Sequence, residues 1–191
     1  MNKKESIFNA GRKLFLSKGF KNTNVSDITK LAGLGVGTFY NYYSSKEELF
    51  FEEFIEESNK HKKYIMEHID LDQDPVKVAM NLISENVSAM KSNQILAEWN
   101  NHELTAELEK YYSEENKKNG DTFYNFYIGI LKKWKREGKI RSDIDDDIIV
   151  ELFGILEYVD THKEKIGIYH FPEAARYLAE FIMKGLTDCP K

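Results

Sequence analysis

Apolar residues recur at helical spacing along nearly the whole 191-residue chain, and no useful stretch shows the apolar–polar alternation of a half-buried strand. Proline is excluded from helix interiors, and it occurs only at Pro75, Pro172 and Pro190. No internal repeat or low-complexity tract interrupts the pattern. The sequence therefore predicts an all-α fold of about nine helices.

Glycine and capping residues mark where these helices begin and end. The first helix stops at Gly19, and Asn24 is a favourable N-cap for the second. Ser45 and Glu48 have the spacing of a capping box that opens a long helix. The expected helical segments are 3–18, 24–32, 36–43, 45–67, 76–91, 95–112 (in one or two pieces), 114–137, 145–165 and 172–186.

Charge is unevenly distributed along the chain. Residues 1–50 hold eight basic and four acidic residues, a net +4, which leaves −9 for the remainder because the whole chain carries −5. A basic head on an acidic body suggests that only the head meets phosphate. On charge alone, ordinary variation in surface composition explains the pattern equally well.

Residues 24–43 have the size of a DNA-binding helix-turn-helix, with its turn at 33–35. Small residues at the start of the recognition helix let the backbone approach DNA, and hydroxyl or amide side chains there contact phosphates or base edges. A lysine at the next helix N-terminus adds a phosphate site. The predicted DNA-binding residues are Gly35, Val36, Gly37, Thr38, Tyr40, Asn41, Tyr42 and Lys46.

The N-terminal residues also resemble a known family. The pattern Ile7, Ala10, Leu14, Phe15, Gly19, Phe20, Thr23, Val25, Ile28, Ala32, Gly33, Gly37, Thr38, Phe39, Tyr40, Tyr43, Lys46, Glu47 and Leu49 is similar to the N-terminal domain of TetR-type bacterial transcriptional regulators. Two positions differ from the usual pattern. Leu34 replaces a valine, and Tyr42 stands where histidine or asparagine is common, which changes the phosphate contact expected there.

The resemblance implies a helix-turn-helix domain at 1–46 and a helical effector-binding and dimerisation domain at 47–191. It implies a homodimer through the last two helices, whose apolar positions cover more than one face. The predicted function is that of a ligand-responsive DNA-binding regulator, a repressor released from double-stranded operator DNA by an unknown small molecule. The predicted dimer residues are Leu152, Phe153, Leu156, Leu178, Phe181 and Ile182.

Several of these residues also have a purely structural interpretation. Phe39 and Tyr43 fit the small core of the head, and Gly33 fits a turn. Tyr40 suits either a phosphate or a packing contact, and Lys46 suits either a phosphate or a solvated helix end.

Polar groups on apolar helix faces mark candidate pocket residues, and aromatic neighbours favour a flat or greasy ligand. Each such residue could equally satisfy its hydrogen bonds locally. The candidates are Ser58, His61, Asn86, Trp99, His102 and Tyr127.

Other classes of protein fit less well. Glu98 and His102, four residues apart, could form an acid–base pair, but no nucleophile, phosphate-loop or metal motif accompanies them, so we expect neither an enzyme nor a cofactor. A purely structural DNA-binding protein would leave the acidic body unexplained. The lone Cys189 fits a reducing compartment, and no apolar run reaches the roughly 18 residues of a membrane span, so we expect a cytoplasmic protein.

Overall fold

The computed structural model describes residues 2–101, 104, 107–111, 113–114, 122–167 and 170–188. Within these ranges every regular element is a helix and none is a strand, which confirms the all-α prediction. The chain divides into two compact units. The first unit comprises Met1–His61 and Ser88–Glu115, and the second comprises Lys62–Val87 and Asn116–Lys191.

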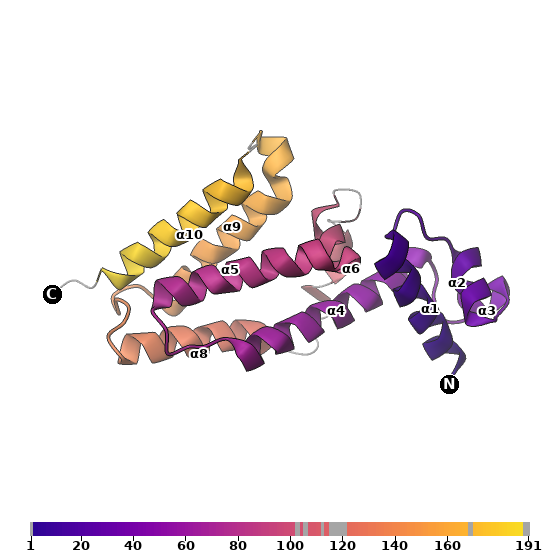
Figure 1. Ribbon diagram of the computed structural model, residues 1–191, viewed down its shortest axis with the longest axis horizontal. Helices are drawn as coiled ribbons and strands as arrows, with labels where there is room; N and C mark the ends of the chain where they lie inside the picture. The colour runs from indigo at the N-terminus through magenta and orange to yellow at the C-terminus, as the bar shows by residue number, and fades with distance from the viewer. Residues whose placement is uncertain are drawn as a thin grey trace. The chain divides into compact units, whose positions relative to one another are not determined.

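The first unit begins with one helix of 16 residues and two shorter ones of 8 and 5 residues. They are α1 (Lys3–Lys18), α2 (Val25–Ala32) and α3 (Val36–Tyr40), drawn in indigo in Figure 1. Asn2 caps α1 in a capping box with Glu5. The Asn24 side chain accepts from the Asp27 N–H at 2.8 Å, which confirms the N-cap predicted from the sequence. The third helix is shorter than expected, because Asn41 and Tyr42 form a turn that brings Tyr43 into the core.

The long helix α4 (Lys46–His68) follows this turn. Its predicted capping box is only half correct. The Glu48 N–H donates to Ser45 Oγ at 3.1 Å, but the Glu48 carboxylate accepts from the N–H and hydroxyl of Ser44, both at 2.6 Å. These two bonds lower the pKa of Glu48 and fix the sharp entry into the helix.

Helix α5 (Pro75–Ser92) leads into two short elements, α6 (Gln94–Ala97) and the 3₁₀ helix η1 (Glu98–Asn100). The Asn93 side chain caps α6 by accepting from the N–H of Ile95 at 2.9 Å and of Leu96 at 3.3 Å. Asn101 is extended, and helix resumes at residues 107–111. The helix expected at 95–112 is therefore interrupted, which is one of the two forms that the sequence predicts.

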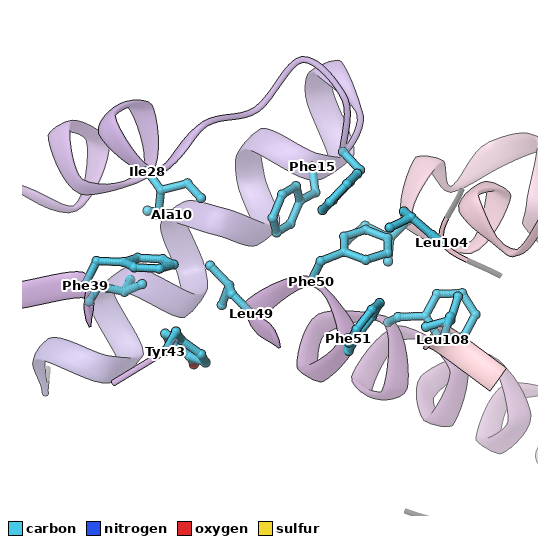
Figure 2. Packing of buried hydrophobic residues seen from close by; sticks show 14 of the residues in the cluster. Ala10, Phe15, Ile28, Phe39, Tyr43, Leu49, Phe50, Phe51, Leu104 and Leu108 are labelled. Atoms are coloured by element: carbon cyan, nitrogen blue, oxygen red, sulfur yellow. The ribbon is translucent and has the colours of Figure 1, made fainter. Parts of the chain in front are cut away.

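Aromatic side chains dominate the core of the first unit (Figure 2). Phe50 is fully buried, and its ring centroid lies 5.1 Å from Phe15 and 4.9 Å from Phe20. A Cβ atom at Gly11 would lie 2.7 Å from Leu49 Cδ2, so glycine lets α1 pack closely against α4. This core holds α1, α2 and α3 together with the first part of α4.

The second unit contains α8 (Thr122–Arg136), α9 (Asp146–Ile166) and α10 (Phe171–Thr187). Helices α9 and α10 lie side by side in Figure 1 and are in direct contact. The part of the predicted 114–137 helix at 115–121 lies outside the described residues. A separate apolar core holds the unit together, and its buried members include Ile65, Val78, Leu82, Ile130, Trp134, Ile140, Ile149, Met183 and Leu186.

No helix in the described part of the chain is both long and apolar enough to cross a membrane.

Candidate nucleic-acid interface

The turn between α2 and α3 is built around one glycine. Gly33 has φ +69° and ψ +31°, a left-handed conformation that other L-residues adopt only with strain. The next N–H, from Leu34, donates to the Thr29 carbonyl at 2.9 Å and closes the end of α2. Gly33 therefore acts as the turn residue that sets the angle between the two helices.

Helix α3 is exposed along one side. Tyr40 is 57% exposed, Val36 44% and Tyr42 40%, although side chains of this size are usually more buried. Asn41 is also exposed, and Thr38 is half-buried. We call the seven residues of this side the recognition surface: Gly35, Val36, Gly37, Thr38, Tyr40, Asn41 and Tyr42.

The two glycines of the recognition surface are not required by the fold. Gly35 has an ordinary extended backbone, with φ −81° and ψ 152°, and Gly37 lies within α3. A Cβ atom added at either position would meet nothing within 4 Å. Glycine in a helix costs about 0.5–1 kcal/mol relative to alanine, so the surface gives up stability to stay flat. A flat surface suits close approach by a ligand as large as duplex DNA.

The opposite side of α3 anchors it. Phe39 is fully buried, and its ring centroid lies 5.7 Å from Tyr43, which is 2% exposed. Burial, with the nearby Glu52 carboxylate, raises the pKa of the Tyr43 hydroxyl. These aromatic contacts confirm the structural interpretation of Phe39 and Tyr43, and they leave Tyr40 and Tyr42 projecting outward.

Lys46 reaches inward rather than standing free at the start of α4. Its Nζ donates to the Phe20 carbonyl at 3.0 Å and to the Thr23 carbonyl at 2.9 Å, and it lies 3.8 Å from the centroid of the Phe20 ring. Burial lowers the pKa of Lys46, while the charges of Glu47 and Glu98 partly oppose this effect. One of its three hydrogens remains for a phosphate, so its predicted DNA contact stays a prediction.

Residues 7–52 match the family model described as bacterial regulatory proteins, tetR family. These N-terminal residues are therefore those of a TetR-type DNA-binding domain. The chain is 24% identical over 196 residues to the uncharacterized HTH-type transcriptional regulator YfiR of Bacillus subtilis, covering 94% of this chain and 91% of that relative. This match extends the resemblance well beyond the helix-turn-helix.

Two solved structures share the fold over nearly the full length. One is the transcriptional regulator FadR from Bacillus subtilis in complex with stearoyl-CoA, at 20% identity and TM-score 0.61, covering 96% of this chain and 99% of that one. The other is Thermus thermophilus FadR, a TetR-family transcriptional repressor in complex with lauroyl-CoA, at 19% identity and TM-score 0.58, covering 94% and 91%. These named relatives are regulators rather than enzymes.

The predicted effector-binding residues of this chain fall in both units. Ser58, His61 and Trp99 belong to the first, and Asn86 and Tyr127 to the second; all five are half-buried. The Trp99 ring stacks on Phe54, with centroids 5.6 Å apart and planes at 18°. His102 lies outside the described residues, so its pairing with Glu98 is not tested. The assignment of an effector site to these residues stays a prediction.

A polar, open hollow lies in the second unit, and none of the predicted effector residues lines it. Tyr124 donates from its hydroxyl to the Asp147 carboxylate across it. Its lining consists of Tyr124, Asn125, Ile128, Lys132, Asp145, Asp146, Asp147 and Ile148. Among the residues the structure describes, no group of three His, Cys, Asp or Glu side chains is placed to hold a metal ion.

The predicted dimer residues line α9 and α10. Phe181 is 62% exposed and Leu178 is 46% exposed in the single chain, while Leu152, Phe153, Leu156 and Ile182 are half-buried. Further large apolar side chains on the two helices are also exposed, namely Ile148, Ile155, Tyr158 and Tyr177. These six exposed large apolar side chains therefore lie on two helices that contact each other.

The structural roles of two acidic residues were not predicted from the sequence, where Glu98 is considered only as an acid–base partner of His102. Glu98 accepts a hydrogen bond from the Phe20 N–H at 3.4 Å, a contact between residues 78 positions apart. Glu53 is completely buried on α4, and neither of its carboxylate oxygens has a hydrogen-bond partner. Glu53 follows Phe50 by three residues and Leu49 by four, so helical spacing places it on the core side of α4.

Proposed function

We propose that this TetR-family regulator is a homodimeric repressor that a small molecule releases from operator DNA. In this proposal residues 1–46 form the DNA-binding domain and residues 47–191 bind the effector and form the dimer. The observation that carries DNA recognition is the recognition surface, where α3 is anchored by Phe39 beneath and kept flat by Gly35 and Gly37.

DNA recognition is tested with duplexes that the wild-type protein selects from a random-sequence library. Gly37→Ala should weaken binding to the selected duplex at least tenfold, because a methyl group displaces the backbone from the groove. Gly129→Ala is the matched control, because a Cβ atom there also meets nothing within 4 Å, and Gly129 lies in α8. Both alanines should raise helix stability by about 0.5–1 kcal/mol.

Opposite effects of Gly37→Ala on stability and on DNA affinity would separate recognition from folding. If Gly37→Ala binds the duplex as tightly as Gly129→Ala does, α3 is not the reading helix. If no duplex is enriched, the proposed DNA recognition itself is wrong.

We propose that the exposed apolar face of α9 and α10 packs against the same face of a second copy of the chain. A two-fold pairing of the helices would bury Ile155, Leu178 and Phe181 and form a four-helix arrangement. Two further glycines are consistent with close helix approach, since a Cβ atom at Gly154 or Gly185 meets nothing within the single chain. The family resemblance supports the same pairing.

Sedimentation at micromolar concentration tests this pairing. Phe181→Glu should shift the protein from dimer to monomer without unfolding it, because the side chain is 62% exposed before association. Lys184→Ala, a change at an exposed position of the same helix, is the control and should leave the dimer intact. A wild-type monomer, or a dimer unaffected by Phe181→Glu, contradicts the proposal.

The proposed effector carries a long apolar chain, with fatty acyl-CoA as the class to test. Two relatives of the same fold were solved with stearoyl-CoA and lauroyl-CoA, and the half-buried aromatic side chains Trp99 and Tyr127 suit an apolar ligand. If an acyl-CoA binds only the folded protein, a concentration of one hundred times its dissociation constant would stabilise the fold by about 2.7 kcal/mol.

Thermal unfolding and DNA release are measured with stearoyl-CoA and lauroyl-CoA, with CoA alone as the control. Stabilisation by the acyl forms and release of the selected duplex would support the proposal. By thermodynamic reciprocity, the duplex must weaken acyl-CoA binding by the same factor. Equal effects of CoA and acyl-CoA would reject the apolar chain as the recognised feature, while DNA recognition would stand.

A further inference from the structure

Both backbone polar groups of Phe20 are hydrogen-bonded to side chains of other elements. Lys46 Nζ donates to the Phe20 carbonyl at 3.0 Å. The Phe20 N–H donates to Glu98 Oε1 at 3.4 Å. Lys46 begins α4 and Glu98 begins η1, so two elements distant in sequence hold the backbone of one residue of the head.

Phe20 lies in the connection that positions α2. Gly19 ends α1 with φ +77°, and Asn24 caps the start of α2. Between them the Thr23 hydroxyl donates to the Gly19 carbonyl at 2.8 Å, and Lys46 Nζ also reaches the Thr23 carbonyl at 2.9 Å. The connection has no helix of its own, so these bonds decide where α2 starts.

Glu98 is itself held by its neighbours. Asn101 Nδ2 donates to Glu98 Oε2 at 2.5 Å, and the adjacent Trp99 ring stacks on Phe54 of α4. Helix α6, directly before η1, packs on α1. The conformation of residues 98–101 therefore determines whether Glu98 Oε1 reaches the Phe20 N–H.

We propose that Glu98 is a positioning residue for the helix-turn-helix. Together with Lys46 it holds the Phe20 backbone, so that α2 and α3 stand in the orientation that binds DNA. It acts through the loop and not by touching DNA. The proposal rests on the proposed DNA recognition and requires no assumption about the effector. It also means that any rearrangement of residues 98–101 changes DNA affinity without altering a DNA-contacting side chain.

The sign of the effect separates this role from simple electrostatics. Removing a negative charge from the protein should by itself strengthen attraction to DNA. Loss of the Phe20 hydrogen bond should instead weaken DNA binding, by about fivefold for one hydrogen bond of ordinary strength. Glu98→Ala is therefore expected to bind the selected duplex about fivefold more weakly than wild type.

Two further variants sharpen the test. Glu98→Gln keeps an oxygen acceptor at the same position and should recover most of the affinity. Glu107→Ala removes the same charge at an exposed position of the same unit, so its DNA affinity should equal or exceed that of wild type. The slope of affinity against salt concentration should be unchanged in Glu98→Ala, because no phosphate contact is lost.

The experiment uses the full-length protein and a duplex that wild type selects from a random library. Circular dichroism first establishes that each variant is folded, and NMR hydrogen exchange reports the Phe20 amide. Faster Phe20 exchange with about fivefold weaker binding in Glu98→Ala, largely restored in Glu98→Gln, is the expected result. Should Glu98→Ala not fold, Asn101→Ala frees Glu98 and should speed Phe20 exchange and weaken DNA binding in the same way.

The positioning role is overturned if folded Glu98→Ala binds the selected duplex as tightly as Glu107→Ala does. The same holds for Asn101→Ala where it takes the place of Glu98→Ala. Unchanged Phe20 exchange overturns it as well. If wild type enriches no duplex, the DNA recognition beneath the proposal is wrong, which is a distinguishable result.

Discussion

Glu53→Gln should stabilise the protein at neutral pH, although it removes a carboxylate next to an arginine. Glu53 is 0% exposed and lacks a hydrogen-bond partner at either oxygen. Burial, with repulsion from Glu56 and Glu57 and only partial compensation by Arg12, raises its pKa to about 9. The folded protein therefore keeps this side chain protonated at pH 7.

The magnitude follows from proton linkage. Between the ordinary pKa of 4.5 and the folded value of about 9, the folded state binds one proton more than the unfolded state. The free energy of unfolding therefore falls by about 1.4 kcal/mol for each unit of rising pH in this window. At pH 7 the accumulated cost is about 3 kcal/mol. A neutral amide of the same shape avoids the cost.

Urea unfolding at a fixed protein concentration, repeated from pH 5 to pH 8, measures the effect. The stability difference between Glu53→Gln and wild type should grow by about 1.4 kcal/mol per pH unit, whatever constant offset the new amide adds. Glu52→Gln is the control, since Glu52 is 39% exposed and pairs with Lys4 at 3.0 Å. Such an exposed pair contributes about 0–1 kcal/mol.

A difference that stays constant across this pH range would refute the reasoning. It would mean that Glu53 remains ionised in the folded protein, with Arg12 compensating its charge fully. The existing ion pair between Arg12 and Glu57, at 2.7 Å, is the structural reason to expect otherwise. One guanidinium has to serve two buried carboxylates, and Glu57 holds the closer position.

Three other substitutions probe the head directly. Lys46→Ala should lower the free energy of unfolding, measured in urea, by about 2 kcal/mol, since two charge-assisted hydrogen bonds are lost. If the slope of DNA affinity against salt concentration falls by about one unit, Lys46 also contacts a phosphate, and an unchanged slope excludes that contact. Tyr40→Phe should leave urea unfolding unchanged, because Tyr40 is exposed. It should weaken binding to the selected duplex about fivefold if the hydroxyl makes the proposed phosphate contact, and equal affinity would remove that role. Gly33→Ala should cost about 1 kcal/mol of stability, measured by urea unfolding, through its positive φ, and a neutral result would mean that the turn relaxes freely.

Features determined by neighbouring residues were predictable from the sequence. The end of α1 at Gly19, the Asn24 cap and the Gly33 turn each depend on residues within one helical turn. The exposure of Val36, Tyr40 and Tyr42 also agrees with their assignment from the sequence, while their contact with DNA stays a prediction. Local chemistry sufficed in each case.

Features that depend on tertiary packing were not predictable. Helix α3 ends at Tyr40 because Tyr43 is drawn into the core beside Phe39, and periodicity alone extended the helix through Tyr43. The contact of Glu98 with Phe20 bridges 78 positions, and no local pattern reports it. The spacing that places Glu53 on the core side of α4 was available, but a carboxylate in that position is normally interpreted as exposed.

The charge of the head also requires the structure for its interpretation. Four of the eight basic residues counted in the sequence make internal contacts: Lys4 with Glu52, Lys18 with Asp27, Arg12 with Glu57, and Lys46 with two carbonyls. The other four, Lys3, Lys13, Lys21 and Lys30, are exposed. Because an exposed cation can exchange its water for a phosphate, we expect these four to add most to non-specific attraction to DNA under the proposed function. Half of the basic residues of the head therefore make contacts within it, and the other half are exposed.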